Sequence, residues 1–482
     1  MKRYSDVKVK DQHAPFDLEL SSAAMRRMGR ACLNSIVEHI SALPHSGCSD
    51  LADGRAIAAT LREPCPESPT DFNQLLKLLI EDVIPASINT AHPSYMGYIP
   101  GGGLFPSAIA ELLAAATNRY VSVWAAAPAI ARLETNVLEW FAQWIGYPES
   151  SCGVLTSGGS MANFTAIVTA RKHLLRGDLA IGTMYISDQA HHSVEKAAML
   201  AGIPERNIRK LKSGVNFRAI PQKFEAAIER DVARGLKPFL VVGNAGTTNS
   251  GAVDPLTDLA DICRKHSLWF HVDAAYGGFF ALCAEGKKKL QGLHRSDSVV
   301  LDPHKGLFLP YGVGCLLVKR GQLLRNAHLL RGEYHKDLVT PKGEMNFTDY
   351  SLEQSRSCRG LAVWLPLKLF GVDSFRKSLA EKLELALWLY QRLAEDPLFE
   401  CPSQPDLSVI TFRYRPRRGD PERLNKRLLK NIIATRNLFL SGTTLRGKYV
   451  LRVCILCFRT HRSEVERAFD LIHAEAKKLE SG

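Results

Sequence analysis

The sequence predicts an α/β protein built around a mostly parallel β-sheet. Between residues 153 and 318, short apolar runs that are typical of buried strands alternate with segments of helical periodicity. Such alternation indicates a parallel sheet with helices on both faces. Two of the apolar runs end at Asp273 and Asp302, and Lys305 follows the second. Because ligands bind beyond the carboxyl ends of strands in such sheets, we expect a site there.

Residues 1–90 are predicted to form a helical extension. Apolar residues recur at helical spacing over residues 25–40 and again over residues 70–83, and Pro44 ends the first pattern. An extension of this kind either packs on a partner subunit or covers its own chain.

Residues 91–360 are predicted to form the large domain. A Gly-rich loop at residues 92–103 is either a pocket wall or a plain connector, and helices are expected at residues 104–116 and 129–144. The expected strands are residues 153–155, 184–187, 238–242, 268–272, 298–301 and 315–318.

The segment 361–482 has a different pattern and is predicted to be a smaller α+β domain. It contains an amphipathic helix at residues 375–393, an alternating strand at residues 409–414 and a strand-rich stretch at residues 445–458. Ser463 and Glu466 are spaced as a capping box for the last helix.

Composition narrows the class of protein. The chain has 482 residues, of which 46% are hydrophobic and 23% charged, as in an ordinary globular enzyme. No apolar run approaches the about 18 residues of a membrane span, and the N-terminus lacks the apolar stretch of a secretory signal. The eleven cysteines are scattered and lie mostly in apolar runs. We therefore expect a cytoplasmic protein that does not bind membranes.

The net charge of +13 raises the question of nucleic-acid binding. Basic residues are densest at residues 413–418 and 423–430, but no groove-reading motif or aromatic platform accompanies them. A solvated basic face, or attraction of anionic ligands, is the favoured interpretation, and no nucleic-acid partner is expected.

Asp273 and Lys305 together suit the chemistry of pyridoxal phosphate. That cofactor needs a lysine to bind it as a Schiff base and an acid that keeps its ring nitrogen protonated. The alternative is a structural Asp–Lys pair at the edge of the sheet, since an aspartate at a strand end often caps the following turn.

A phosphate site is predicted where residues 157–160 follow a strand and open a helix. Gly158 and Gly159 let backbone N–H groups approach an anion, and Ser160 adds a hydroxyl. The alternative is an ordinary helix cap with flexible glycines.

His191 follows the strand at residues 184–187, where a histidine can stack on a flat ring or move a proton. A hydrogen-bonded surface pair with His192 is the alternative. A metal cluster of His191, His271, His304 and Asp273 was also considered, but their spacing does not match a helical zinc motif, so no metal is predicted.

With these segments assembled, the sequence resembles the group II pyridoxal-phosphate-dependent amino-acid decarboxylases, which include the aromatic-L-amino-acid, glutamate, cysteine-sulfinate and diaminobutyrate decarboxylases. The resemblance extends from about His92 to the C-terminus. It is carried by residues 188–191, 246–248, 271–276, 302–305 and 445–460. It implies a fold-type I transferase-like fold, a homodimer with its site between subunits, and decarboxylation of an L-amino acid.

The resemblance also implies roles for single residues. Lys305 would form the Schiff base, Asp273 would bind the ring nitrogen, and His191 would stack on the ring. Thr248 would lie near cofactor and substrate, and the loop residue Tyr334 would protonate the carbanion. The residues implied to hold the phosphate are Gly158, Gly159, Ser160, Ser298 and His304.

Two questions stay open at this point. Relatives with Phe in place of Tyr334 make an aldehyde oxidatively, so Tyr at this position favours plain decarboxylation. Aldehyde synthesis is the alternative. A third hypothesis is a cofactor-binding protein without turnover.

The substrate is not determined. Gly306 and Ser94 stand where aromatic decarboxylases carry larger residues, which puts an aromatic substrate in doubt, and Arg119 and Tyr120 are expected near a partner's pocket.

Overall fold

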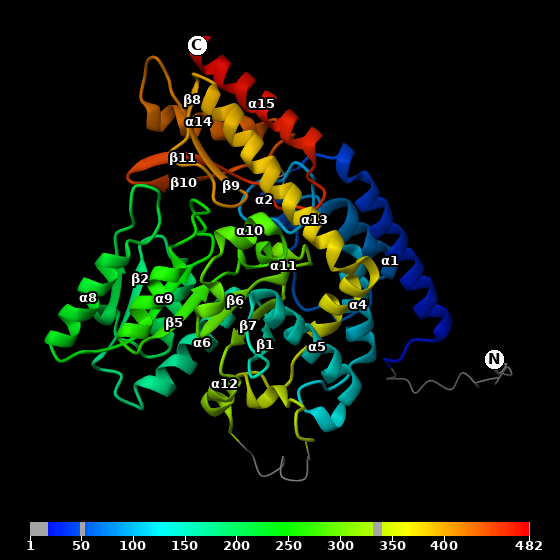
Figure 1. The fold of residues 1–482 in the computed structure, drawn as a ribbon. Helices are drawn as coiled ribbons and strands as arrows, with labels where there is room; N and C mark the ends of the chain where they lie inside the picture. The colour runs from blue at the N-terminus through cyan, green and yellow to red at the C-terminus, as the bar shows by residue number, and fades with distance from the viewer. Residues whose placement is uncertain (1–17, 49–53, 331–339, 482) are drawn as a thin grey trace. The chain divides into compact units, whose positions relative to one another are not determined.

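The computed structural model describes residues 18–48, 54–330 and 340–481, and the chain divides into two compact units, residues 1–88 and 89–482 (Figure 1). The boundary between the two units, after residue 88, lies close to the end of the expected helical extension at residue 90.

The N-terminal unit is helical. Ser21 caps the first helix, α1, by accepting a hydrogen bond from the Ala24 amide. Asp71 caps α3 by accepting hydrogen bonds from the Asn73 and Gln74 amides. None of the residues of the first helix is buried, although it carries an apolar stripe. The helices are α1 (Ser22–Ala42), η1 (Leu43–His45), α2 (Gly54–Thr60), α3 (Phe72–Lys77) and the π-helix η2 (Leu78–Val83).

The described part of the second unit contains a seven-stranded sheet of order β1-β7-β6-β5-β4-β2-β3. Strand β7 is antiparallel to both neighbours, and the remaining pairs are parallel, as the sequence predicted. The strands are β1 (Cys152–Thr156), β2 (Gly182–Ser187), β3 (Ile208–Leu211), β4 (Lys237–Asn244), β5 (Trp269–Asp273), β6 (Ser298–Leu301) and β7 (Gly314–Val318).

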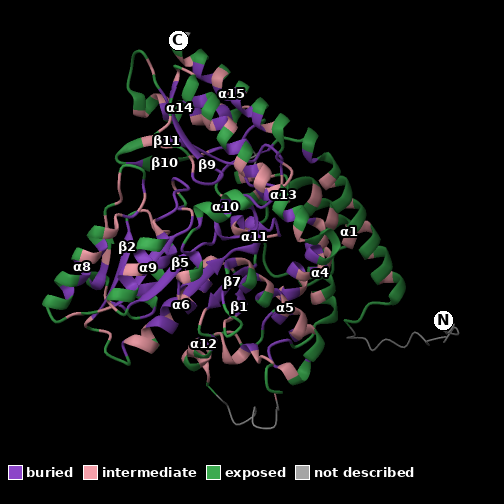
Figure 2. Ribbon diagram, viewed as in Figure 1, coloured by how far each residue is buried: buried purple, intermediate pink, exposed green. Residues whose placement is uncertain are grey.

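Helices cover both faces of this sheet. Neighbouring strand residues point to opposite sides: Trp269 packs in a core with α6, α7 and α12, whereas Phe270 packs in a second core with α5, α8 and α9. Figure 2 shows the strands as buried. The helices are α4 (Phe105–Thr117), α5 (Pro128–Ile145), α6 (Gly159–Leu174), α7 (His192–Leu200), α8 (Pro221–Ala233), α9 (Leu256–Lys265), α10 (Ala284–Lys289), α11 (Pro303–Gly306) and α12 (Gly321–His328).

The C-terminal region forms a second sheet, of order β10-β11-β9-β8 in the described residues. Helix α13 begins at Arg359, well before the predicted start at residue 375, and bends at Gly371, whose φ is 71°. It contacts α4 and α5 as well as α15 and β9, so it runs through the expected boundary at residue 360. The elements are α13 (Arg359–Glu395), β8 (Phe399–Glu400), β9 (Val409–Tyr414), α14 (Pro421–Ala434), β10 (Ser441–Leu445), β11 (Lys448–Cys454) and α15 (Arg462–Ser481).

The capping box predicted for the last helix is wrong in its residues. Helix α15 begins at Arg462, and the His461 amide donates to Glu464 Oε2 at 2.9 Å. Glu466 instead binds Arg462 within the helix. The helix starts earlier than expected because Glu464, rather than Glu466, reaches back to the chain before the first turn.

Candidate active site

A cavity of about 270 Å³ lies beyond the carboxyl ends of β4, β5 and β6. Its walls come from the start of α6, the start of α7, the loop after β4 and the segment that follows β6. The residues that the sequence nominated and that line this cavity are Gly158, Gly159, Ser160, His191, Thr248, Asp273, His304 and Lys305.

Lys305 reaches the cavity from α11, directly after β6. Its Nζ lies 2.8 Å from Asp302 Oδ2. Burial lowers the pKa of the Lys305 amine, but the carboxylates of Asp302 and Asp273 outweigh this effect and raise the pKa above its usual value. Lys305 is therefore an ammonium at neutral pH in the free protein.

Asp273 is the last residue of β5 and is buried. Its Oδ1 accepts a hydrogen bond from the Ala275 amide at 3.1 Å, and its Oδ2 accepts one from Asn163 Nδ2 at 3.0 Å. These two donors fix the orientation of the carboxylate at the cavity wall.

The start of α6 has the features of an anion site. Gly158 precedes the helix with a φ of 156°. A Cβ on Gly159 would lie 3.0 Å from Asp302 Oδ2 and 3.2 Å from Ala275 Cβ, so the absence of a side chain lets these groups approach closely. The free amides of the helix N-terminus attract a phosphate. An anion site, a carboxylate and an amine in one cavity are the groups that pyridoxal phosphate requires, so the residues present fit this cofactor.

His191 caps helix α7 from the cavity wall. Its Nδ1 accepts from the Ser193 amide at 3.3 Å and lies 2.7 Å from Ser193 Oγ. Burial lowers the pKa of His191, although the Asp273 carboxylate acts in the opposite direction. The imidazole is therefore neutral at neutral pH.

One expected phosphate ligand needs correction, and one expected catalytic residue falls outside the described residues. Ser298 does not line the cavity: it is the first residue of β6, and its Oγ lies 2.8 Å from both Trp269 Nε1 and His271 Nδ1. Ser298 begins β6, whereas the cavity lies at the other end of that strand, where Lys305 follows. Ser298 therefore cannot hold a phosphate bound at the start of α6. Tyr334 lies outside the described residues.

Gly306 and Ser94 do not enlarge the cavity. A Cβ on Gly306 would lie 2.8 Å from Phe279 Cβ, so bulk at this position would point into the core. Neither residue lines the cavity. These two positions therefore give no reason to exclude an aromatic substrate.

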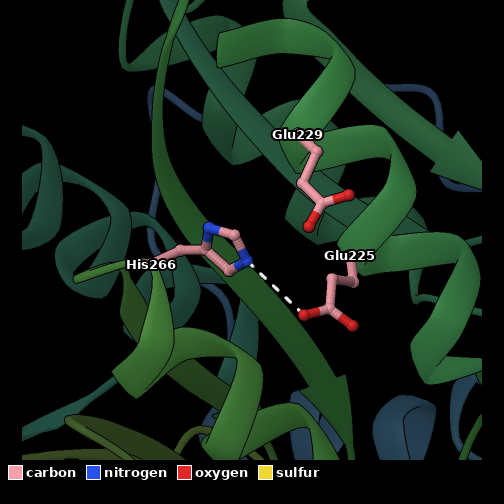
Figure 3. Close-up of side chains that lie close together, drawn as sticks. All are labelled: Glu225, Glu229 and His266. Atoms are coloured by element: carbon pink, nitrogen blue, oxygen red, sulfur yellow. Dashed lines mark ion pairs between the residues drawn. The ribbon is translucent and has the colours of Figure 1, made fainter. Parts of the chain in front are cut away.

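The histidines near the cavity do not gather as metal ligands. Within the described ranges, the group of three ligand atoms close together is formed instead by Glu225 and Glu229 of α8 with His266, which follows α9 (Figure 3). Lys265 Nζ lies 2.6 Å from Glu225 Oε1 and 3.8 Å from a Glu229 oxygen. The Lys265 ammonium thus pairs closely with Glu225 and lies near Glu229.

Sequence reasoning missed Asn163 and Arg452, and it placed Asp302 at a strand end without giving it a role. Asn163 stands three residues after the predicted phosphate loop, on the same helix, which was a usable signal. Arg452 is buried in β11, with Nε donating to Thr248 O at 2.8 Å and Nη1 to Tyr98 O at 2.6 Å. Its Nη2 has no partner among the described residues. An arginine inside an apolar strand was the available signal.

Comparisons with known proteins show which family the chain belongs to. The family model described as the pyridoxal-dependent decarboxylase conserved domain matches residues 56–415. An aromatic-L-amino-acid decarboxylase of Bacillus atrophaeus is 35% identical over 96% of this chain and 98% of its own length. A phenylacetaldehyde synthase of Arabidopsis thaliana is 29% identical over 95% and 97%. The crystal structure of Oryza sativa TDC with PLP and tryptamine has a TM-score of 0.91, with 25% identity over 97% of this chain and 100% of that one.

The chain therefore belongs to the pyridoxal-dependent decarboxylase family. It is a pyridoxal-phosphate-dependent enzyme that decarboxylates an amino acid, on the fold-type I scaffold that its structural relatives share. Among the described residues, no helix is both long and apolar enough to span a membrane.

Proposed function

We propose that the cavity at Lys305 and Asp273 decarboxylates an L-amino acid with an aromatic side chain to its amine. The observation that carries the proposal is that an amine, a carboxylate and a helix N-terminus line one cavity. When bound, the cofactor supplies an electron sink for the bond that breaks at Cα.

Each residue then has a defined task. Lys305 provides the amine to which the cofactor is attached, and Asp273 keeps a proton on the ring nitrogen. The amides at Gly158 and Gly159 bind the phosphate, together with Ser160 and His304. His191, neutral by virtue of its burial, lies against the ring, and Tyr334 returns a proton to Cα.

The aromatic substrate class is supported by the relatives named above. Arg452 binds the Tyr98 carbonyl, and its unpartnered Nη2 suits the carboxylate of the substrate.

The enzyme is proposed to act as a cytoplasmic homodimer. The solvent face of α4 exposes Leu112 and Leu113, and the following Arg119 and Tyr120 are also exposed, as residues that line a partner's site would be in one isolated chain. All eleven cysteines, each of which lies in the described ranges, are free thiols, which suits a reducing compartment.

The test is a product assay on the purified holoenzyme with the common L-amino acids. The wild type should release CO₂ and an aromatic amine. The substitution Lys305→Ala should remove both the turnover and the visible absorption band of the lysine-bound cofactor, whereas Lys288→Ala, on the exposed α10, should change neither. A Lys305→Ala protein that keeps the band and the turnover would overturn the proposal.

Aldehyde synthesis is the second candidate, favoured by the similarity to phenylacetaldehyde synthase. The two activities differ in oxygen consumption and in peroxide release. Tyr334 predicts amine as the product for the wild type and a shift towards aldehyde for Tyr334→Phe. Aldehyde from the wild-type enzyme would favour this alternative.

A further inference from the structure

One buried amide contacts both sides of the cofactor site. We infer that Asn163 is a positioning residue that sets the orientation of the Asp273 carboxylate and, through Ser193, the tautomer of His191. The inference rests on the roles proposed for Asp273 and His191. Asn163 lies in the first turns of α6 and is 1% exposed, and no part of the reaction described above uses it.

The hydrogen-bond partners define the positions of the nitrogen and the oxygen of the Asn163 amide. Its Nδ2 lies 3.0 Å from Asp273 Oδ2 and 3.2 Å from Ser193 Oγ, and its Oδ1 lies 2.9 Å from His271 Nε2. A carboxylate only accepts hydrogen bonds, so the nitrogen must face Asp273 and the oxygen must face His271. Both N–H groups and the oxygen of the amide are therefore used.

On the side of Asn163 away from the cavity, a buried chain of hydrogen bonds joins it to His271, Ser298 and Trp269, and each group donates to the next one towards Asn163. Because Asn163 Oδ1 accepts, His271 carries its proton on Nε2, and its Nδ1 accepts from Ser298 Oγ at 2.8 Å. Ser298 Oγ in turn accepts from Trp269 Nε1 at 2.8 Å. Burial lowers the pKa of His271 to about 4, which agrees with a neutral ring. Trp269, Ser298 and His271 thus hold the Asn163 amide in one orientation.

In front of Asn163, the two N–H groups diverge to opposite parts of the cavity. One stabilises the charged form of Asp273. The other occupies a lone pair of Ser193 Oγ, so the Ser193 hydroxyl proton is directed to His191 Nδ1, 2.7 Å away. The Ser193 amide donates to the same nitrogen. His191 therefore carries its own proton on Nε2.

Only a primary amide meets these demands at this position. A carboxylate would place a second negative charge beside Asp273, and an aliphatic side chain would leave Asp273, Ser193 and His271 each without a buried partner. The amide thus links the group that holds the ring nitrogen to the group that lies on the ring.

The experiment compares Asn163→Leu and Asn163→Asp with wild type. Asn425→Leu is the matched control, because the Asn425 amide is equally buried but bonds only to Tyr414 and Pro421 of the C-terminal region. The measurements are the Kd of the apoprotein for pyridoxal phosphate, the pH midpoint of the visible band of the reconstituted enzyme, and the pH profile of kcat/KM. The free energy of unfolding of each apoprotein is measured alongside.

We expect Asn163→Leu to raise the Kd for the cofactor about tenfold or more, as the loss of a hydrogen bond to a charged group does. The pH midpoint of the visible band and the acidic limb of kcat/KM should both move. Asn163→Asp should retain the fold and weaken cofactor binding more at high pH, where both carboxylates are ionised, than at low pH. Asn425→Leu should lower stability and leave all three site measurements unchanged.

The inference fails if the Asn163 variants that fold bind the cofactor and titrate as the wild type does. It also fails if Asn425→Leu shifts the site measurements equally, because that would reduce Asn163 to a stability effect. If Asn163→Leu does not fold, Asn163→Asp decides alone. A failure of the proposed function is distinguishable, because Lys305→Ala would then keep the visible band whatever the Asn163 variants show.

Discussion

At the scale of single residues, the site is defined by charges that are buried close together. Asp302 is 1% exposed, and one of its oxygens pairs with Lys305, while its Oδ1 has no partner among the described residues. In the free protein the Lys305 amine is therefore protonated. Attachment of a carbonyl group requires the neutral amine, so Asp302 would oppose capture of the cofactor by the proposed Schiff-base lysine.

Asp302→Asn should accelerate the capture of pyridoxal phosphate by the apoprotein. Removing the charge lowers the pKa of Lys305, and each unit of pKa gives about a tenfold larger fraction of free amine at pH 7. Stopped-flow absorbance over a range of pH measures the rate. Asp297→Asn, at the amino end of the same strand, is the control and should leave the rate unchanged. An unchanged rate in Asp302→Asn would mean that the ion pair does not hold the proton.

His271 should make the apoprotein sensitive to acid. Burial lowers its pKa from 6.5 to about 4, so the unfolded chain takes up a proton before the folded one does. Its contribution to stability is complete above pH 6.5 and is lost as the pH falls towards 4. Between pH 7 and pH 5 we expect wild type to lose about 2 kcal/mol more than His271→Gln, which keeps a donor for Asn163. Urea unfolding at the two pH values measures this, and equal losses would contradict it.

At the scale of elements, the site depends on how α6 meets the sheet. The helix begins at Gly159, between the Asp302 carboxylate and Ala275, and it brings Asn163 next to Asp273 one turn later. One helix would therefore supply both the proposed phosphate site and the support of Asp273, the proposed partner of the ring nitrogen. The parallel register that sets Asp273 beside Val300 brings the ends of β5 and β6 to the same edge.

Gly159→Ala should weaken cofactor binding without unfolding the protein. The new methyl would lie 3.0 Å from Asp302 Oδ2 and 3.2 Å from Ala275 Cβ, so these neighbours would have to move by a few tenths of an ångström. We expect a Kd about tenfold higher or more, from about 1.4 kcal/mol of lost affinity. Fluorescence titration of the apoprotein measures the Kd. Gly29→Ala on α1, which meets no atom within 4 Å, is the control for the general effect of alanine in a helix.

At the scale of the whole molecule, the chain exposes apolar surface that a solitary enzyme would bury. Leu112 and Leu113 on α4 are 64% and 54% exposed, and Leu369 and Phe370 on the adjoining α13 are 61% and 45% exposed. Exposed apolar side chains gathered on two contacting helices are typical of a protein interface. The α1 helix, with no buried residue, points to the same conclusion.

The double substitution Leu112→Glu with Leu113→Glu should convert the proposed dimer to a monomer. Desolvating charges at an interface costs several kcal/mol of association free energy. This cost exceeds the free energy that holds a dimer of moderate affinity together. Sedimentation analysis measures the mass, and decarboxylation should fall in parallel if Arg119 and Tyr120 complete the partner's site. Leu200→Glu, on the exposed end of α7, is the control. A wild-type monomer would contradict the prediction.

Local patterns in the sequence predicted the fold class and most of the cavity wall. Strands such as residues 268–272 are apolar because both of their faces are buried, so the pattern and the polar strand ends are visible without coordinates. The same reasoning missed β3, whose four residues include two charged side chains, and the first part of α13, which contains Pro366 and bends at Gly371. Short edge strands and interrupted helices depend on packing rather than on periodicity.

What the sequence alone determined is therefore the parallel sheet, the cofactor and the group of residues at the ends of β5 and β6, because neighbours along the chain carry that information. What the tertiary structure decided is the set of partners across the chain. It placed Ser298 with His271 and Trp269 instead of with the phosphate, directed Gly306 to Phe279, and brought Asn163 to Asp273. These contacts join segments up to 110 residues apart, and the direction of a side chain at such a contact follows from packing, which no local pattern encodes.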